Sequence, residues 1–281
     1  MEKRHESKQI ECLNCGAYVK ATFCDHCGQR VRDNSDRSVS RLLGEFLGNL
    51  FFIDNRFLLS VGYLIRFPGR MTVEFLEGKR KKFISPISLF LFFNLIYFLV
   101  NPLSDYSLAL YDQTYSQPYS GKWMEDWIRL KLQNEGLDWQ AYSIIYQKMS
   151  DNIAKSIMII NVPLIALFMY PMVFKSRRYY FDSIIFAFHY FSVFMASLVM
   201  LSWANTGFEF LSVPDDLIIY DLSFILFTLG IPILYAMLSI KKFLGIRWYW
   251  AIPAGLGVVI ALALASLCYR FIIFIITFWF T

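Results

Sequence analysis

Five long apolar runs constrain this chain more than any other feature of its sequence. A bilayer core of about 30 Å is crossed by roughly 20 apolar residues in a helix. Runs of this kind occupy residues 84–100, 153–174, 183–203, 217–240 and 250–280. Hydrophobic residues make up 57% of the chain and charged residues only 17%, which is too little polar surface for a water-soluble domain. The sequence therefore predicts an all-α polytopic membrane protein with about five transmembrane helices.

The charges beside these runs predict an orientation, because Lys and Arg are retained on the cytoplasmic side of short loops. The basic residues that precede the first run, or separate the second from the third and the fourth from the fifth, are Lys79, Arg80, Lys81, Lys82, Lys175, Arg177, Arg178, Lys241, Lys242 and Arg247. The outer loop 101–152 instead carries 4 Lys and Arg against 7 Asp and Glu. We therefore expect a multi-pass protein of the cell membrane with its N-terminus in the cytoplasm and its C-terminus outside.

The net charge of +5 lies entirely in residues 1–82, which hold 15 Lys and Arg and 10 Asp and Glu. Residues 1–41 hold 8 basic and 6 acidic residues, which is not the basic footprint of a nucleic-acid-binding domain. The surplus therefore indicates membrane topology, and no nucleic-acid partner is expected.

Two Cys-x-x-Cys-Gly motifs near the N-terminus predict a metal site. Cys12 and Cys15 form the first pair, Cys24 and Cys27 the second, and eight residues separate Cys15 from Cys24. Each pair places two thiolates on one side of a tight turn, and two such knuckles make the tetrahedral four-sulfur site typical of structural zinc. We expect zinc with a structural role, because four sulfurs leave no open coordination position.

Iron in a rubredoxin-like site and a redox role for one Cys-x-x-Cys pair are the alternatives to zinc. His26 lies inside the second knuckle, where we expect it to face solvent rather than bind the metal. The predicted cytoplasmic location supports the metal site, because disulfides are disfavoured there and thiolates stay available. Cys268, in the last apolar run, is predicted to be a small residue facing lipid or another helix.

The chain divides into four parts on this basis. Residues 1–28 are the cytoplasmic zinc ribbon and residues 29–41 a polar linker. Residues 42–82 contain cytoplasmic amphipathic or interfacial helices followed by the basic run, and residues 83–281 form the membrane domain.

Residues 42–67 have a helical pattern without the composition of a membrane span. Two apolar stripes recur at three- and four-residue spacing, interrupted by Asp54 and Asn55. The preferred interpretation is two short helices that pack on the membrane domain or lie in the headgroup region. A re-entrant hairpin is the alternative, and it would require burial of Asp54 and Arg56 within protein.

A Pro-Gly turn at Pro68 and Gly69 predicts a short helix over residues 71–77, which Gly78 ends. The basic run Lys79, Arg80, Lys81 and Lys82 then leads into the first span. These four cations are candidate ligands for anionic lipid, at around 1 kcal/mol each, although we prefer the interpretation that they only enforce topology.

The segment 67–86, with the sequence FPGRMTVEFLEGKRKKFISP, and the double-knuckle ribbon before it resemble a group of bacterial membrane proteins catalogued as domain of unknown function 3667. The resemblance extends to residues 178–182 and 186–189 at the third span. It implies a bacterial inner-membrane location and an architecture, but not an activity.

Polar residues inside the predicted spans are the candidates for an intramembrane site, because such residues are costly in a bilayer. His189 is the best of them, at about 9 Å inside the third span, and Asn94 and Asn161 are similar in kind. For His189 we prefer a neutral imidazole that is hydrogen-bonded to another helix, and a proton or substrate role is the alternative. Kinks are expected at the span residues Pro163, Pro171 and Pro232.

The fifth run is too long for one bilayer crossing. Arg270 lies about 30 Å beyond Trp250, so residues 271–280 protrude unless the helix tilts strongly or Pro253, Gly255 and Gly257 loosen its start.

The outer loop 101–152 contains aromatic residues at four-residue spacing and two predicted amphipathic helices, at 123–132 and 137–149. The aromatic rings of this loop could bind sugars or lipid headgroups, or could anchor the loop at the membrane interface, and we favour anchoring.

The chain has no nucleophile elbow, phosphate loop, zinc-protease motif or dinucleotide fingerprint, so we do not expect an enzyme. The preferred hypothesis is a scaffold, assembly or regulatory membrane protein whose ribbon docks a cytosolic protein partner or stabilises the amphipathic region. The alternative is a small-solute or lipid transporter that uses His189, Asn94 and Asn161. The sequence is compatible with an oligomer.

Overall fold

The computed structural model describes residues 10–19, 22–30, 55–100, 108–174, 176, 178–214 and 218–281. The predicted linker from residue 31 onward and the first amphipathic stripe lie outside these residues. The N-terminal ribbon contains an antiparallel pair, β1 (Ile10–Glu11) and β2 (Tyr18–Val19), and a single β-bridge between Phe23 and Arg30. The other elements of the described chain are helices. The helices are α2 (Asn55–Arg66), α3 (Arg70–Leu76), α4 (Pro86–Val100), α5 (Leu110–Tyr115), α6 (Lys122–Glu135), α7 (Trp139–Ile157), α8 (Asn161–Phe174), α9 (Tyr180–Phe210), α10 (Ile218–Ile225), α11 (Ile231–Leu244) and α12 (Trp248–Phe280).

Four helical stretches are long and apolar enough to cross a membrane. They are Trp139–Phe174, Tyr180–Phe210, Ile218–Leu244 and Trp248–Phe280, and they contain four of the five predicted runs. The first predicted run forms α4, a shorter apolar helix of 15 residues. The structure thus confirms a helical membrane protein, while the count of five spans stays a prediction.

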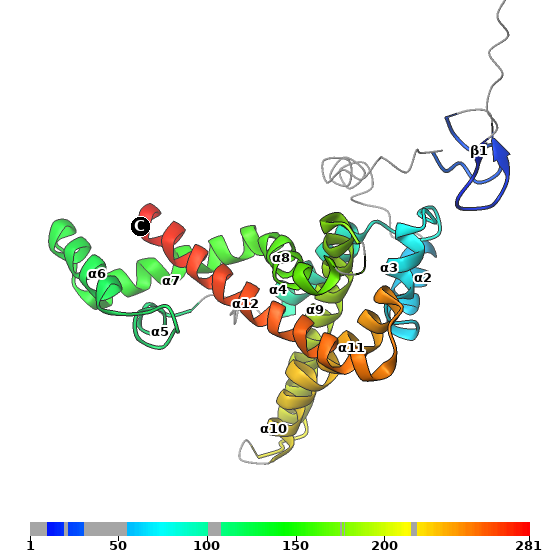
Figure 1. The fold of residues 1–281 in the computed structure, drawn as a ribbon. Helices are drawn as coiled ribbons and strands as arrows, with labels where there is room; N and C mark the ends of the chain where they lie inside the picture. Colours follow the sequence, from blue (N-terminus) through cyan, green and yellow to red (C-terminus); the bar gives the residue numbers. More distant parts are fainter. Residues whose placement is uncertain are drawn as a thin grey trace, which may run out of the picture.

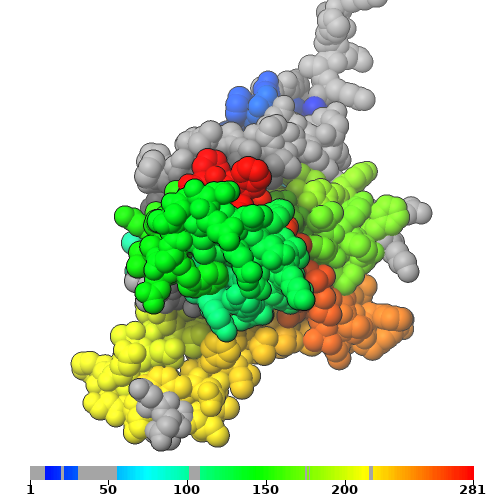
Figure 2. All heavy atoms as spheres, turned by 90° about the vertical axis from the view of Figure 1, so that its left-hand side faces the viewer, coloured from blue at the N-terminus to red at the C-terminus, as the bar shows by residue number. Residues whose placement is uncertain are grey.

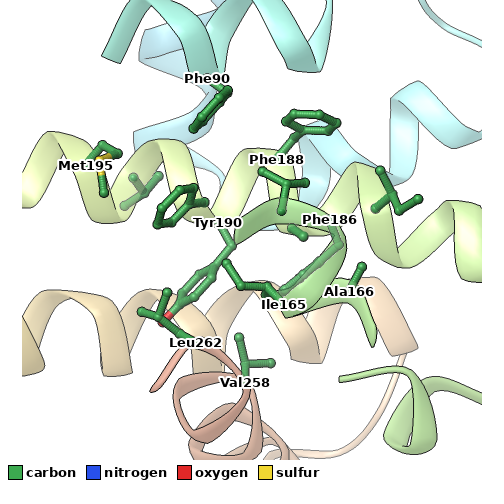
Figure 3. Packing of buried hydrophobic residues seen from close by; sticks show 14 of the residues in the cluster. Phe90, Ile165, Ala166, Phe186, Phe188, Tyr190, Met195, Val258 and Leu262 are labelled. Atoms are coloured by element: carbon green, nitrogen blue, oxygen red, sulfur yellow. The ribbon is translucent and has the colours of Figure 1, made fainter. Parts of the chain in front are cut away.

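Helix α9 packs against α4 and α8, and α12 packs on α8 and α11. Figure 3 shows Phe90 of α4 on one side of α9 and Val258 and Leu262 of α12 on the other. Phe90 of α4 stacks on Phe191 of α9, and Val258 and Leu262 of α12 belong to the same buried cluster. The apolar part of α9 is 78% buried, against 33% for that of α12, so α9 is the most buried of the four stretches.

Two of the three prolines predicted to disturb spans coincide with irregular helix. A 3-10 turn, η1 (Met158–Ile160), precedes Pro163, and a π-helical segment, η2 (Leu226–Gly230), precedes Pro232. Proline has no backbone N–H to donate to the carbonyl four residues earlier, so the turn before it rearranges. Pro171 lies inside the regular helix α8.

Helix α7 belongs to the same continuous stretch as the second span. The sequence contains no Gly or Pro between Trp139 and Asn161, so nothing ends the helix at the expected loop boundary. Helices α6 and α7 otherwise confirm the two helices predicted in the outer loop.

The C-terminal end of α12 is covered by the outer-loop helices. Phe274 of α12 is fully buried in a cluster with residues of α5, α6 and α7, namely Leu110, Met124, Ile128, Tyr142 and Tyr146. Figure 2 shows α5, α6 and α7 (green) gathered beside the end of α12 (red). The length of the fifth run is thus explained by packing on the outer loop.

The start of α12 is not loosened by its glycines. The helix runs without interruption from Trp248 to Phe280, with Pro253 inside it. A Cβ atom at Gly255 would lie 2.8 Å from the backbone nitrogen of Met237 on α11, so this glycine permits close approach of two helices.

Candidate metal centre

Four cysteine sulfurs converge in the N-terminal ribbon. The Sγ atoms of Cys12, Cys15, Cys24 and Cys27 all lie within 4.8 Å of one another, and the pairs 12–27 and 15–24 are each 3.6 Å apart. Four sulfurs held tetrahedrally at about 2.3 Å from a zinc ion are about 3.8 Å apart. The cluster therefore fits a metal ion bound by four thiolates, as the spacing predicts.

The two knuckles have the same backbone geometry. The N–H of Cys12 donates to the carbonyl of Ala17 and the N–H of Gly16 to the carbonyl of Cys12, each at 2.8 Å. The second knuckle repeats this pattern, from Cys24 to Gln29 and from Gly28 to Cys24. Gly16 and Gly28 have φ angles of 77° and 67°, a region that favours glycine. The Gly after each Cys-x-x-Cys is thus required by the turn.

Backbone amides favour the thiolate at Cys24. Hydrogen bonds from the N–H of Cys27, then from that of His26 and from the Cys15 and Cys12 side chains, outweigh burial and lower the pKa of the Cys24 thiol to about 7. Cys12 and Cys24 are buried in the ribbon, and His26 is exposed, as predicted for a residue that does not bind the metal. The donor set suits zinc or iron, and four sulfurs complete the coordination of either ion.

The ribbon contacts the turn that follows α3. The side-chain amide of Gln29 donates to the carbonyl of Gly78 at 2.7 Å, and its oxygen accepts from the N–H groups of Arg80 and Lys81 at 3.3 Å each. A Cβ atom at Gly78, where φ is 98°, would lie 2.7 Å from the side chain of Leu13. The ribbon (blue) accordingly lies beside α2 and α3 in Figure 1. The ribbon that holds the metal site is thus hydrogen-bonded, through Gln29, to the backbone of the basic run 79–82.

Helix α3 packs against both α9 and α11 of the bundle. Thr72 Oγ1 lies 2.8 Å from Nδ1 of His189 on α9, and both residues are buried. On the other side, a Cβ atom at Gly69 would lie 2.8 Å from the Cα atom of Ser239 on α11. Gly69 has a φ of 74°, so both its conformation and its surroundings require glycine.

The segment that makes these contacts also matches a family model. Residues 54–98 match the family model described as Protein of unknown function (DUF3667). This match confirms the predicted resemblance for α2, α3, the basic run and most of α4, which we call the DUF3667 segment. The ribbon and residues 178–189 lie outside it. No curated protein and no solved structure matches the chain.

A buried carboxylate organises the DUF3667 segment. Glu74 accepts hydrogen bonds from Tyr63 Oη at 2.6 Å and Arg70 Nε at 2.9 Å, and Lys82 Nζ donates to it at 3.0 Å. Burial alone would raise the pKa of Glu74, but hydrogen bonds from Tyr63, Lys82 and Arg70 outweigh it and lower that pKa. Glu74 thus joins α2, α3 and the basic run.

Three of the four cations predicted as lipid ligands have partners within the protein. Lys82 pairs with Glu74, Lys79 lies 3.5 Å from Glu77, and the guanidinium of Arg80 lies 5.2 Å from the ring centre of Phe75. Lys81 has an exposed side chain. Anionic-lipid binding by this run stays a prediction, and the structure gives the run a second role in folding.

The predicted intramembrane residues do not converge on one site. His189 lies on α9, Asn161 at the start of α8, and Asn94 on α4. The side-chain amide of Asn161 donates to the carbonyl of Met158, one turn back, while His189 bonds to Thr72. None of the hydrogen bonds in the described part of the chain joins any two of these three residues.

Sequence reasoning missed Thr72, Gln29 and Glu74. Thr72 and Glu74 stand in an ordinary amphipathic helix, and Gln29 was placed at the start of a polar linker. Gly78 was the residue that could have predicted these contacts, because a glycine that ends a helix can also mark the close approach of another segment.

Proposed function

We propose that this chain is a non-enzymatic integral membrane protein with a scaffold, assembly or regulatory role, in which a structural zinc ribbon holds the DUF3667 segment in place. The observation that carries the proposal is the three-way contact of Gln29 with Gly78, Arg80 and Lys81. A closed four-sulfur site has no position for a substrate, so its contribution is folding energy rather than chemistry.

The contacts support a structural connection that runs from the metal site, through the ribbon and α3, to the membrane helix α9. The metal orders the ribbon, the ribbon contacts the turn at Gly78, and α3 before that turn bonds to α9 through Thr72 and His189. A small ribbon with few buried apolar residues depends on its metal to fold, so loss of the metal removes the first link.

The proposed topology places the ribbon in the cytoplasm of a bacterial cell and the C-terminus outside the inner membrane. The positive-inside rule supports this orientation. A cytosolic protein that binds the ribbon is part of the proposal.

Transport has less support. A small-solute or lipid pathway through His189, Asn161 and Asn94 needs these groups to share a route, whereas they lie on three helices and the first two bond to different partners.

The test compares Cys12→Ser and Cys24→Ser with Cys268→Ser in the full chain. The first two variants are expected to lose bound metal and cellular abundance, to be cut faster by trypsin after Lys79–Lys82, and to recover less cytosolic partner in cross-linked pull-downs. Cys268→Ser is expected to behave as the unmodified protein. Unchanged abundance, cleavage and partner recovery in the metal-free variants would show that the ribbon has no such role.

A further inference from the structure

Three contacts join α2 to the start of α4 and to the turn that precedes it. Tyr63 packs on Phe83 with ring centres 5.1 Å apart, and Ser60 Oγ accepts a hydrogen bond from the N–H of Ile84 at 3.0 Å. Phe57, nearer the start of α2, packs on Phe92 at 4.3 Å. Later residues of the segment 83–92 therefore contact earlier residues of α2, and the start of α2 lies beside Phe92.

This register gives α2 a depth. Phe92 is six residues after the start of α4, so it lies about 9 Å along an apolar helix from Pro86. The basic run 79–82, at the level expected for lipid headgroups, immediately precedes that start. The end of α2 that contains Phe57 is thus level with hydrocarbon, while the end that contains Arg66 is level with the headgroups.

The polar groups of α2 between Arg56 and Arg66 are satisfied within the protein, and Arg56, beside Phe57, has an interaction of its own. Between Arg56 and Arg66 the helix has no charged residue, and its two hydroxyl groups are bonded within the protein. Ser60 donates to the carbonyl of Arg56 and accepts from Ile84, and Tyr63 donates to Glu74. In a bilayer, polar groups have to be satisfied internally in this way.

The outward face of α2 is apolar. Leu58, Leu59 and Ile65 are exposed by 70%, 45% and 67%, and a Cβ atom at Gly62 between them would meet nothing within 4 Å. The apolar helix α4 likewise exposes Leu95 and Leu99. A soluble surface rarely presents such a face without charges between its apolar residues, whereas lipid acyl chains match it.

We propose that α2 is inserted into the cytoplasmic leaflet with its start beside Phe92 of α4, and that Leu58, Leu59 and Ile65 contact lipid acyl chains. The alternative of a helix lying flat in the headgroup region puts both ends of α2 at equal depth. The inserted helix instead places Leu58 deeper than Ile65 by up to about 10 Å, since seven residues separate them.

The test measures the depth of single spin labels in the full chain reconstituted in phosphatidylcholine–phosphatidylglycerol vesicles. A keto amino acid at position 58, 59 or 65 takes the label without involving the ribbon cysteines. Position 99 on α4 serves as the lipid-exposed control. Position 130 on α6, where Leu130 is 56% exposed, serves as the water-exposed control.

We expect spin labels at positions 58 and 59 to collide with oxygen as often as a label at position 99 does, and to be protected from a water-soluble nickel complex. A label at position 65 should show intermediate access to both reagents. Equal depths at 58 and 65, nickel access like that of position 130, or protection from both reagents would each overturn the proposal. Protection from both would mean that protein covers this face.

A second measurement uses the unmodified protein. Trypsin cleavage after Arg56 and Arg66 releases the peptide 57–66, which contains the whole exposed face of α2. A photoactivated apolar carbene confined to the bilayer is expected to label this peptide. An unlabelled 57–66 peptide beside a labelled α4 peptide would contradict insertion.

Discussion

Thr72 and His189 form a buried hydrogen bond, 2.8 Å between Oγ1 and Nδ1, across 117 residues of sequence. The bond joins a seven-residue helix of the DUF3667 segment to helix α9 of the bundle. It also accounts for a histidine inside an apolar helix, because a neutral imidazole with a hydroxyl partner is tolerated there. The edge of the Phe75 ring, 6.5 Å away between centres, covers the same imidazole.

Removing the hydroxyl of Thr72 should destabilise the protein. Thr72→Val keeps the side-chain shape and leaves the imidazole Nδ1 buried without its partner, at an expected cost of about 1–3 kcal/mol. Thr72→Ser keeps the hydroxyl and should retain most of the stability. Thermal unfolding of the purified protein in detergent measures both, and equal midpoints for Val and the parent would show that the bond contributes nothing.

Gly69→Ala should be far more harmful than Gly136→Ala. Both glycines have left-handed φ angles, 74° and 66°, so both substitutions introduce similar backbone strain of about 1–2 kcal/mol. Only at position 69 does the new methyl group meet backbone, that of Ser239, whereas at position 136 nothing lies within 4 Å. The excess cost at position 69 is expected to be about 1–3 kcal/mol, from the same unfolding measurement. An equal loss of stability in the two variants would mean that α3 does not pack closely against α11.

Gly255→Ala and Gly207→Ala should have opposite effects. Both glycines are helical, and alanine is a better helix former by about 1 kcal/mol, so Gly207→Ala, in open space, should stabilise. At position 255 the methyl group would meet the backbone of Met237, and the expected loss is about 1–3 kcal/mol. A stabilising Gly255→Ala would disprove the close contact of α12 with α11.

Stability should fall at acidic pH through Glu74. Its pKa is lowered in the folded protein, so the folded state binds the proton more weakly than the unfolded chain. This contribution is present above the unfolded pKa of about 4.3 and is lost as pH falls through the folded value. Unfolding midpoints between about pH 6 and pH 3 should show a smaller decline for Glu74→Gln. An identical pH profile for the variant would remove Glu74 as a source of the effect.

The local features of the fold were predictable from the sequence, whereas their long-range partners were not. The cysteine spacing predicts the cluster because covalent connection and two glycines confine each knuckle. Gly78 was correctly placed at the end of a helix, but its contact with Leu13 joins segments 65 residues apart, which periodicity does not report. His189 was predicted to be a buried polar residue, and only the fold supplies Thr72.

The apolar runs show the same limit. Length and composition locate the helices, yet they did not show that α7 continues into the second span or that the outer loop covers the end of α12. The buried contact of Phe274 with Tyr146 and its neighbours depends on how the chain folds back, and many apolar sequences of this composition would satisfy the same pattern.

The central claim is that the metal-bound ribbon holds the DUF3667 segment in place. Hydrogen exchange of the full chain, measured before and after removal of the metal, tests this claim most directly. Gln29→Ala is the matched variant, because it keeps all four cysteines. The account predicts faster exchange of the amides of Arg80 and Lys81 and of α3 in both the metal-free protein and the variant, with α12 unchanged. Exchange in residues 70–82 that is unaffected by metal removal would contradict it.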